Sequence, residues 1–215
     1  MIDAYLNGVE RWTAGPESRK RQIRAEVAEH LAAAEQAGDL DGAIARLGTP
    51  REAATTFSEG YSFEPAPVPR RLGAALIDMA IFAGLLTAAA GIGAMSAAQS
   101  DDGSGTVAIA VVAVLMFVGA GFWWAIGLTL MEWRVGRTPG KAALGLRVIA
   151  ETGIAPSFPQ VLVRRLTLVF SGPLQIIDWV FMFFNPKHQR AFDIIARTVV
   201  VQDERSAALE MAPAS

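Results

Sequence analysis

Two long apolar segments dominate this chain of 215 residues. Residues 72–100 contain a single charged side chain, Asp78, and residues 106–131 contain none. About 20 apolar residues are enough to cross the hydrocarbon core of a bilayer as a helix. The sequence therefore predicts two transmembrane helices, and its mean hydropathy of +0.33 is high for a soluble protein.

The loops around these segments predict the orientation of the chain. The connection 97–105 contains no Lys or Arg, whereas basic residues flank the two segments on their other side. These are Arg70, Arg71, Arg134, Arg137, Lys141 and Arg147. Because short cytoplasmic loops carry the basic excess, we expect the N-terminus and residues 132–165 in the cytoplasm. The expected location is a bacterial-type cytoplasmic (inner) membrane, crossed more than once.

A third apolar segment, 166–185, is harder to interpret because it contains Gly172-Pro173 and Asp178. It is long enough to cross, but basic residues lie on both sides of it, so a simple span would place one basic group outside. A hairpin broken at Gly172-Pro173 would keep both groups inside, since proline bends a helix. We favour a bent or re-entrant hairpin over a kinked span, and the side of the C-terminus depends on this choice.

Residues 1–62 show apolar side chains at helical spacing and predict a small cytoplasmic helical bundle. Within it, Thr49-Pro50-Arg51-Glu52 has the pattern of a helix start, with a hydroxyl cap, an early proline and a glutamate. A proline-rich linker, 63–69, leads to a membrane module at 70–201, and 202–215 is expected to be a disordered tail. The predicted fold class is all-α: a polytopic helical membrane protein preceded by a helical bundle.

Composition excludes several classes of function. The chain has no cysteine and two histidines, His30 and His188, so a thiolate or histidine metal site is not expected. A net charge of −2 argues against a nucleic-acid binder. The sequence pairs no nucleophile with a base, and we expect neither an enzyme nor a cofactor.

Asp78 is the most informative single residue. It lies seven positions after Arg71, which places both on one helix face about 10 Å apart. An acid at this depth pairs with a cation, lines an ion path or bonds to a neighbouring helix, because an isolated charge is costly there. A proton carrier and a structural aspartate both remain open for Asp78. For Asp178 we favour the structural interpretation.

The loop after the second apolar segment, 136–148, combines apolar spacing with basic residues. Its spacing does not match a phosphate loop. An amphipathic stretch in the headgroup region fits better, and Lys141 and Arg147 are candidates for contact with anionic lipid or the interface.

Residues 3–60 resemble the HAAS domain, a short all-helical cytoplasmic signalling module. The resemblance rests on Glu29-His30-Leu31 and, above all, on Leu47-Gly48-Thr49-Pro50 with Ala53-Ala54. It implies a head that binds a cytoplasmic partner.

Residues 70–201 resemble the RDD family of small integral membrane proteins. The opening motif runs from Arg70 to Asp78, the central element "GxTxGKxxxGLRV" matches 136–148, and the closing motif matches 190–201. The resemblance implies that Arg71, Asp78 and Asp193 are the arginine and two aspartates for which the family is named. Phe192 departs from the His or Gly that often precedes the second aspartate.

The RDD resemblance implies a transport-related role, for which cation/proton antiport has been proposed in some members. Two or three spans cannot enclose a path alone, so transport requires a homo-oligomer or another membrane protein in the bilayer. Asp193 would close the cytoplasmic mouth or form a structural pair with Arg71 or Arg147. The alternative function is a non-transporting adaptor or regulatory subunit whose head binds a cytoplasmic partner.

Overall fold

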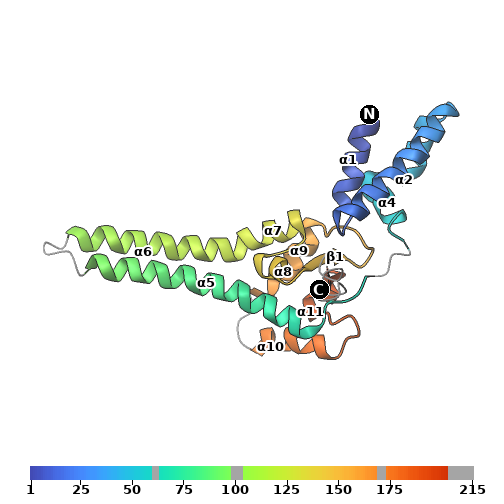
Figure 1. Cartoon of the computed structure of the whole chain (residues 1–215). Coiled ribbons are helices and arrows are strands. Elements are labelled where there is room, and N and C mark those ends of the chain that lie inside the picture. The colour runs from blue at the N-terminus through green and yellow to red at the C-terminus, as the bar shows by residue number, and fades with distance from the viewer. Residues whose placement is uncertain (60–62, 98–103, 169–172, 203–215) are drawn as a thin grey trace, which may run out of the picture.

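Two long helices lie side by side along the molecule (Figure 1). In this computed structural model, which describes residues 1–59, 63–97, 104–168 and 173–202, helix α5 (Val68–Ala97) leads away from the body. Helix α6 (Ser104–Phe122) returns antiparallel to it and continues through a π-helical turn, η1 (Trp123–Gly127), into α7 (Leu128–Val135). The rings of Phe82 and Trp124 pack between the two runs with centroids 4.9 Å apart.

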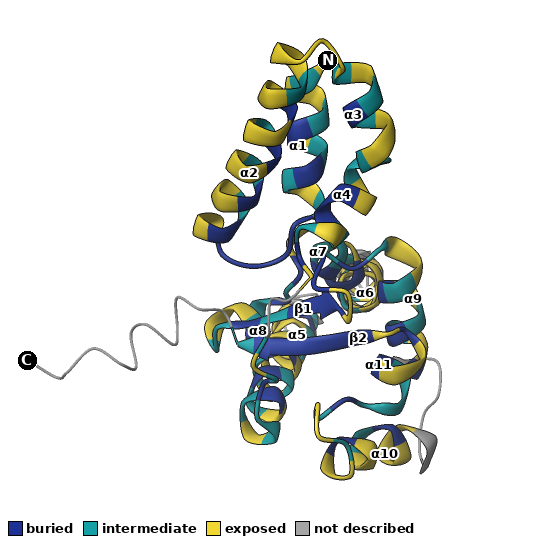
Figure 2. Ribbon diagram, turned by 90° about the vertical axis from the view of Figure 1, so that its right-hand side faces the viewer, coloured by how far each residue is buried: buried dark blue, intermediate teal, exposed yellow. Residues whose placement is uncertain are grey.

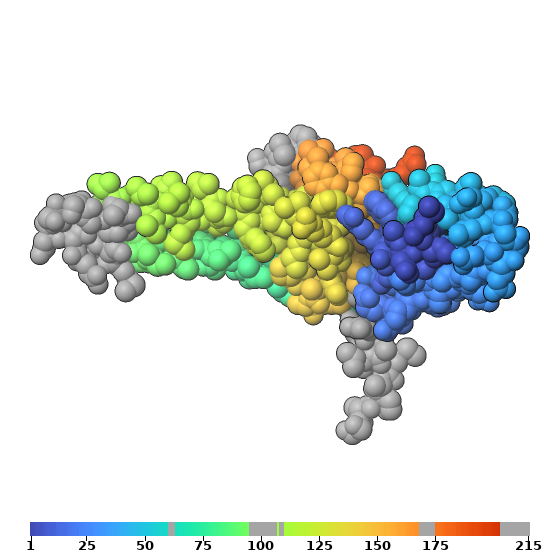
Figure 3. All heavy atoms as spheres, turned by 90° about the horizontal axis from the view of Figure 1, so that it is seen from above, coloured from blue at the N-terminus to red at the C-terminus, as the bar shows by residue number. Residues whose placement is uncertain are grey.

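This hairpin confirms the two predicted apolar spans. Residues Val68–Ala94 and Ala110–Val135 are long and apolar enough to cross a membrane. The 30 residues of α5 extend about 45 Å, which matches a bilayer with its headgroups. Only 11% of the most apolar stretch in each span is buried, and Figure 3 shows the hairpin projecting uncovered from the body. Exposed side chains such as Leu76, Val114 and Phe117 therefore suit lipid rather than water.

The third apolar segment and the helix that precedes it form short pieces. Helix α9 (Phe158–Arg165) passes into a 3-10 turn, η2 (Leu166–Leu168), and α10 (Pro173–Val180) passes into another, η3 (Phe181–Phe183). Each of these α-helices has eight residues, about 12 Å, which is too short to cross the hydrocarbon core. Of the predicted break, Gly172 lies outside the described residues and Pro173 begins α10.

The head is a bundle of four helices, α1 (Ile2–Trp12), α2 (Glu17–Gln36), α3 (Leu40–Leu47) and α4 (Pro50–Thr56). Their apolar faces meet in one core around Val9, Val27 and Leu31. The predicted helix start is confirmed: the Thr49 hydroxyl accepts from the Glu52 amide, and Glu52 accepts from the Thr49 amide at 2.7 Å.

The fold is mostly helical, as predicted, but it also contains two strands that the sequence analysis did not predict. Strands β1 (Leu146–Ala150) and β2 (Thr198–Gln202) pair antiparallel, with Val148 opposite Val200. The stretch 136–148 is therefore not one amphipathic segment: it forms α8 (Pro139–Ala143), turns at Gly145 with φ of 65°, and enters β1. The end of this stretch contains β-branched residues and pairs with β2. The strand pairing therefore prevails over the preference for a helix that the spacing of the apolar residues indicated.

The first part of the proline-rich segment, 63–67, is extended and pairs with β2, whereas Val68 and Pro69 already belong to α5. The Ala66 amide donates to the Val200 carbonyl at 2.9 Å, and the Gln202 amide donates to Glu64 at 3.3 Å. The segment thus continues the sheet before α5 begins. Beyond Gln202, the expected disordered tail lies outside the described residues.

The sheet forms a layer between the head and the base of the hairpin (Figure 2). On one face, Leu146, Val148 and Val200 pack with Ala74 of α5. On the other face, Ile149 and its neighbours Val199 and Val201 pack with Ala14 and Phe63 from the head side. Alternate residues of a strand point to opposite faces, so one short sheet contacts both parts of the molecule.

Candidate functional site: a buried charge cluster at the base of the hairpin

Asp193 is completely buried and forms the centre of one half of the cluster. It lies on α11 (Ala191–Ile195), where it accepts from the Arg190 amide at 3.2 Å and caps the helix. Three guanidinium groups surround its carboxylate: Arg71 of α5 in a short hydrogen bond, Arg164 of α9 at 3.2 Å, and Arg190 at 3.4 Å. Burial alone would raise the pKa of Asp193, but the three arginines hold it well below its ordinary value.

Glu132 of α7 is the centre of the other half and is 1% exposed. It accepts from Lys141 of α8 at 2.7 Å, and it pairs with Arg164 at 3.2 Å and Arg165 at 3.4 Å. Because Arg164 contacts both Glu132 and Asp193, it joins the two halves into one network. Arg164 is itself 1% exposed and also donates to the Thr198 hydroxyl at 3.4 Å, which ties the network to β2.

Lys141 is the cation most affected by this environment. Burial lowers the pKa of its ammonium group; Glu132 opposes that effect, and the neighbouring Arg164 and Arg165 add to it. The result is a pKa of about 7. The lowered pKa therefore reflects, above all, the removal of this ammonium group from water.

Asp78 joins α5 to α8. Its two carboxylate oxygens accept from the Thr138 hydroxyl at 2.6 Å and from the Gly140 amide at 2.7 Å. The helices approach so closely that a Cβ atom at Gly140 would lie 2.0 Å from the Ala74 carbonyl oxygen. Asp78 therefore forms hydrogen bonds to a neighbouring helix. A structural aspartate of this kind is one of the two alternatives that the sequence left open.

Asp178 of α10 is 1% exposed and ties α10 to α11. It accepts from the Phe192 amide at 3.0 Å and lies 3.9 Å from Arg190, whose guanidinium also lies over the Trp179 ring. This geometry agrees with the structural interpretation of Asp178.

The structure brings Arg71, Asp78, Asp193 and Lys141 to one end of the hairpin. Arg71, one of the two predicted partners of Asp193, is the one that contacts it. Arg147 lies apart on β1 and donates to the Val135 carbonyl at 3.1 Å, where it holds the end of α7.

Sequence reasoning missed the central pair of the network, Glu132 and Arg164. Glu132 is the first charged residue after the uncharged segment 106–131. An acidic residue at the end of a predicted span could have marked it as a candidate site residue. Arg164 and Arg165 are among the basic residues that precede segment 166–185, and the sequence indicated for them only a role in membrane topology. Their contact with Glu132, about 30 positions earlier in the chain, has no local signature.

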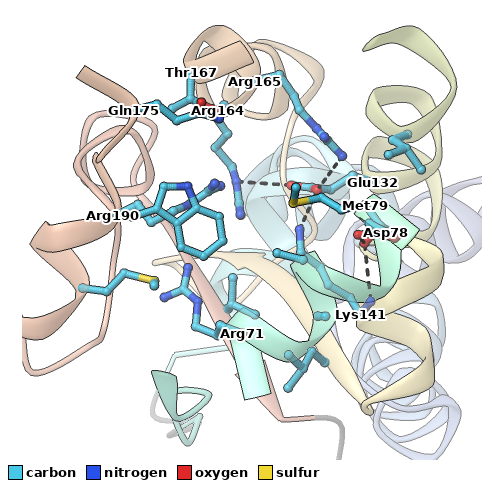
Figure 4. Close-up of a pocket in the computed structure, with 18 of the residues that line it drawn as sticks. Arg71, Asp78, Met79, Glu132, Lys141, Arg164, Arg165, Thr167, Gln175 and Arg190 are labelled. Carbon is cyan, nitrogen blue, oxygen red and sulfur yellow. Dashed lines mark hydrogen bonds and ion pairs between the residues drawn. The ribbon is translucent and has the colours of Figure 1, made fainter. Parts of the chain in front are cut away.

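A cavity of about 130 Å³ lies between these elements (Figure 4). Among the residues that the structure describes, five cations and two carboxylates line it: Arg71, Lys141, Arg164, Arg165, Arg190, Asp78 and Glu132. In Figure 4, Arg164 and Arg165 reach Glu132 from one side and Lys141 reaches it from the other, while Arg71 rises from below. No group of three or more metal-ligating side chains occurs among the described residues. The chemistry available here is charge pairing and ion binding.

The fold and the cluster define an integral membrane protein with a helical head, a two-helix membrane hairpin and a buried charge network at the hairpin's base. The chain belongs to the RDD family, whose family model matches residues 65–197. Residues 4–55 match the HAAS model, so the order of a HAAS domain followed by an RDD module is confirmed. Neither the curated proteins nor the solved structures contain a match to this chain.

Proposed function

We propose that this RDD protein is a regulatory membrane subunit. Its HAAS head binds a cytoplasmic partner, and its membrane module responds to that binding. One observation carries the proposal: the head is docked on the membrane module through backbone contacts. The Ala155 amide donates to the Trp12 carbonyl at 2.7 Å, and Thr13 bridges to Ile154. Ile154 and Ala150 belong to the core of the head itself.

Arg19 reinforces this junction. It is 4% exposed, and its guanidinium donates to the Ala14 carbonyl at 2.7 Å and to the Gly153 carbonyl at 3.4 Å. The turn at Gly153 directly follows β1, whose opposite face packs on α5 through Ala74. A partner that moves the head would therefore strain β1, and through β1 the helix that carries Arg71 and Asp78.

Hydrogen exchange of the full-length chain in lipid nanodiscs tests this coupling. Arg19→Gln removes the bond to the Gly153 carbonyl across the junction, together with the bond to Ala14 within the head, and we expect faster amide exchange in β1 and β2 as well as in the head. Arg21→Gln, an exposed arginine on the same helix, is the matched control and should leave both strands unchanged. If Arg19→Gln speeds exchange in the head alone, the head does not act on the membrane module and the proposal fails.

A second candidate function is a component for cation or proton transport. The position of Asp78 favours it, because this carboxylate lines the cavity at the hairpin base together with Lys141. Two spans cannot enclose a path, so this function needs a homo-oligomer or another membrane protein against the exposed faces of α5 and α6. We propose no enzymatic role.

Cation-driven proton flux in proteoliposomes separates the two candidates. The regulatory proposal expects no flux above empty liposomes with Na⁺, K⁺ or Li⁺. Flux that Asp78→Asn abolishes, and that Asp41→Asn in the head retains, would replace it with the transport function.

A further inference from the structure

The wall of the cavity at the hairpin base carries an excess of positive charge. Five cations line it against the carboxylates of Asp78 and Glu132; Asp178 and Asp193 do not line it but pair with three of these cations, which leaves one positive charge in excess. Burial is the main cause of the lowered pKa of Lys141, and the neighbouring Arg164 and Arg165 add to it. An anion in the cavity would offset the repulsion.

Arg71 provides a buried donor that has no hydrogen-bond partner in the described part of the chain. Its side chain is 5% exposed, and one terminal nitrogen, Nη2, is bonded to Asp193. The other, Nη1, is buried without a hydrogen-bond partner among the residues that the structure describes. A buried donor left unpaired is costly, so a guanidinium nitrogen in this state at a cavity wall indicates an acceptor supplied from outside the chain.

The rest of the wall is mostly apolar and aromatic, with Thr138, Thr167 and Gln175 as its uncharged polar members. Trp124 and Leu128 come from the second span, while Trp179 and Met182 come from α10 and η3. A volume of about 130 Å³ is well above what a single water molecule needs, so the cavity accepts one small polyatomic group. The cavity therefore suits a compact anionic group that lies against apolar side chains.

The position of the cavity along the spans places it near the membrane surface. Arg71 is the fourth residue of α5, and Glu132 lies three residues before the end of α7. Both are therefore within about 6 Å of the ends of their helices along the axis. This end of the cavity therefore corresponds to the headgroup region on the side of the head, while its other end, at Asp78, lies about 15 Å along α5 from the start of the helix.

We propose that this cavity binds a phosphate group, supplied either by an anionic phospholipid headgroup or by free phosphate. Arg71, Arg165 and Arg190 approach it from α5, α9 and the start of α11, and Lys141 approaches from α8. Donors that converge from several sides suit a tetrahedral anion with several oxygens better than a planar carboxylate, and guanidinium groups bind phosphate oxygens in pairs. The site does not depend on the regulatory role proposed above.

Thermal unfolding of the full-length chain in uncharged detergent tests the proposal, with tryptophan fluorescence as the readout. A ligand that binds the native state raises the unfolding temperature in a saturable way. Phosphatidylglycerol, phosphatidylcholine and inorganic phosphate are titrated separately, with chloride at equal ionic strength as the salt control. A rise with phosphatidylglycerol alone identifies the lipid headgroup as the source, and a rise with inorganic phosphate identifies the free anion. No saturable rise with either one overturns the proposal.

Two variants then locate the site. In Arg165→Gln and Lys141→Gln, Glu132 keeps its pair with Arg164, so the network retains its centre. Each variant removes a charged donor from the wall, and we expect a half-saturating concentration at least about tenfold higher. The matched control is Arg134→Gln, an exposed cation on α7 that does not line the cavity.

An unchanged half-saturation in both cavity variants would overturn the assignment. So would an equal loss in Arg134→Gln, because a general attraction of surface cations to an anionic lipid would then explain the binding. If the cavity variants do not fold, the wild-type titration still decides the proposal.

Discussion

Replacing Asp193 by asparagine should cost more stability than any other single change at the base of the hairpin. Asp193 is fully buried and compensates three guanidinium groups, those of Arg71, Arg164 and Arg190. Asparagine preserves the shape but removes the charge, which leaves three buried cations to repel one another. Breaking a buried ion pair by removing one partner costs about 3–5 kcal/mol. For a chain of this size that corresponds to a fall in Tm of about 6–20 °C.

The assay is thermal unfolding of the full-length chain in detergent, followed by the fluorescence of its five tryptophans. Asp178→Asn is the matched control, because Asp178 is equally buried but has one amide bond and one ion pair at 3.9 Å. We expect about 1–3 kcal/mol for that change. A loss in Asp193→Asn no larger than that in Asp178→Asn would refute the reasoning that the three arginines depend on Asp193.

The pH dependence of Asp193 has a definite sign. Its pKa in the folded chain lies below the ordinary value of about 4, so the unfolded chain binds more protons in acid. The stability that Asp193 contributes is therefore fully present above about pH 4 and declines as the pH falls below it. In Asp193→Asn this part of the acid-induced loss should disappear.

Two further predictions concern α8. The pKa of Lys141 is lowered to about 7, so the unfolded chain binds more protons between about pH 7 and 10, and stability should rise with pH across that window. Unfolding temperatures measured at several pH values should show this rise in the wild type and a flatter profile in Lys141→Gln; an identical slope would contradict the shifted pKa. Gly140→Ala should destabilise the chain by about 1–3 kcal/mol, because the new Cβ would lie 2.0 Å from the Ala74 carbonyl oxygen. Gly84→Ala, where nothing lies within 4 Å, is its control and should be nearly neutral in the same unfolding assay.

The sequence by itself determined the features that depend on local composition. A helix crosses a bilayer because of the apolar character of about 20 consecutive residues, so Val68–Ala94 and Ala110–Val135 could be predicted without knowing their neighbours. The same holds for the cap at Thr49, whose partner Glu52 lies three residues away. Motif order also indicated the RDD and HAAS families before any geometry was known.

The tertiary structure alone decided which charges meet. Strands β1 and β2 lie about 50 positions apart, and neither segment carries the information that it will pair with the other. Arg71 and Arg147 were equal candidates for Asp193 until α5 placed Arg71 beside it. Glu132, Arg164 and Lys141 converge from three different helices. Ion pairs of this kind depend on the direction in which each helix presents its side chains and on burial from water, and both are properties of the packed molecule rather than of any segment of the sequence.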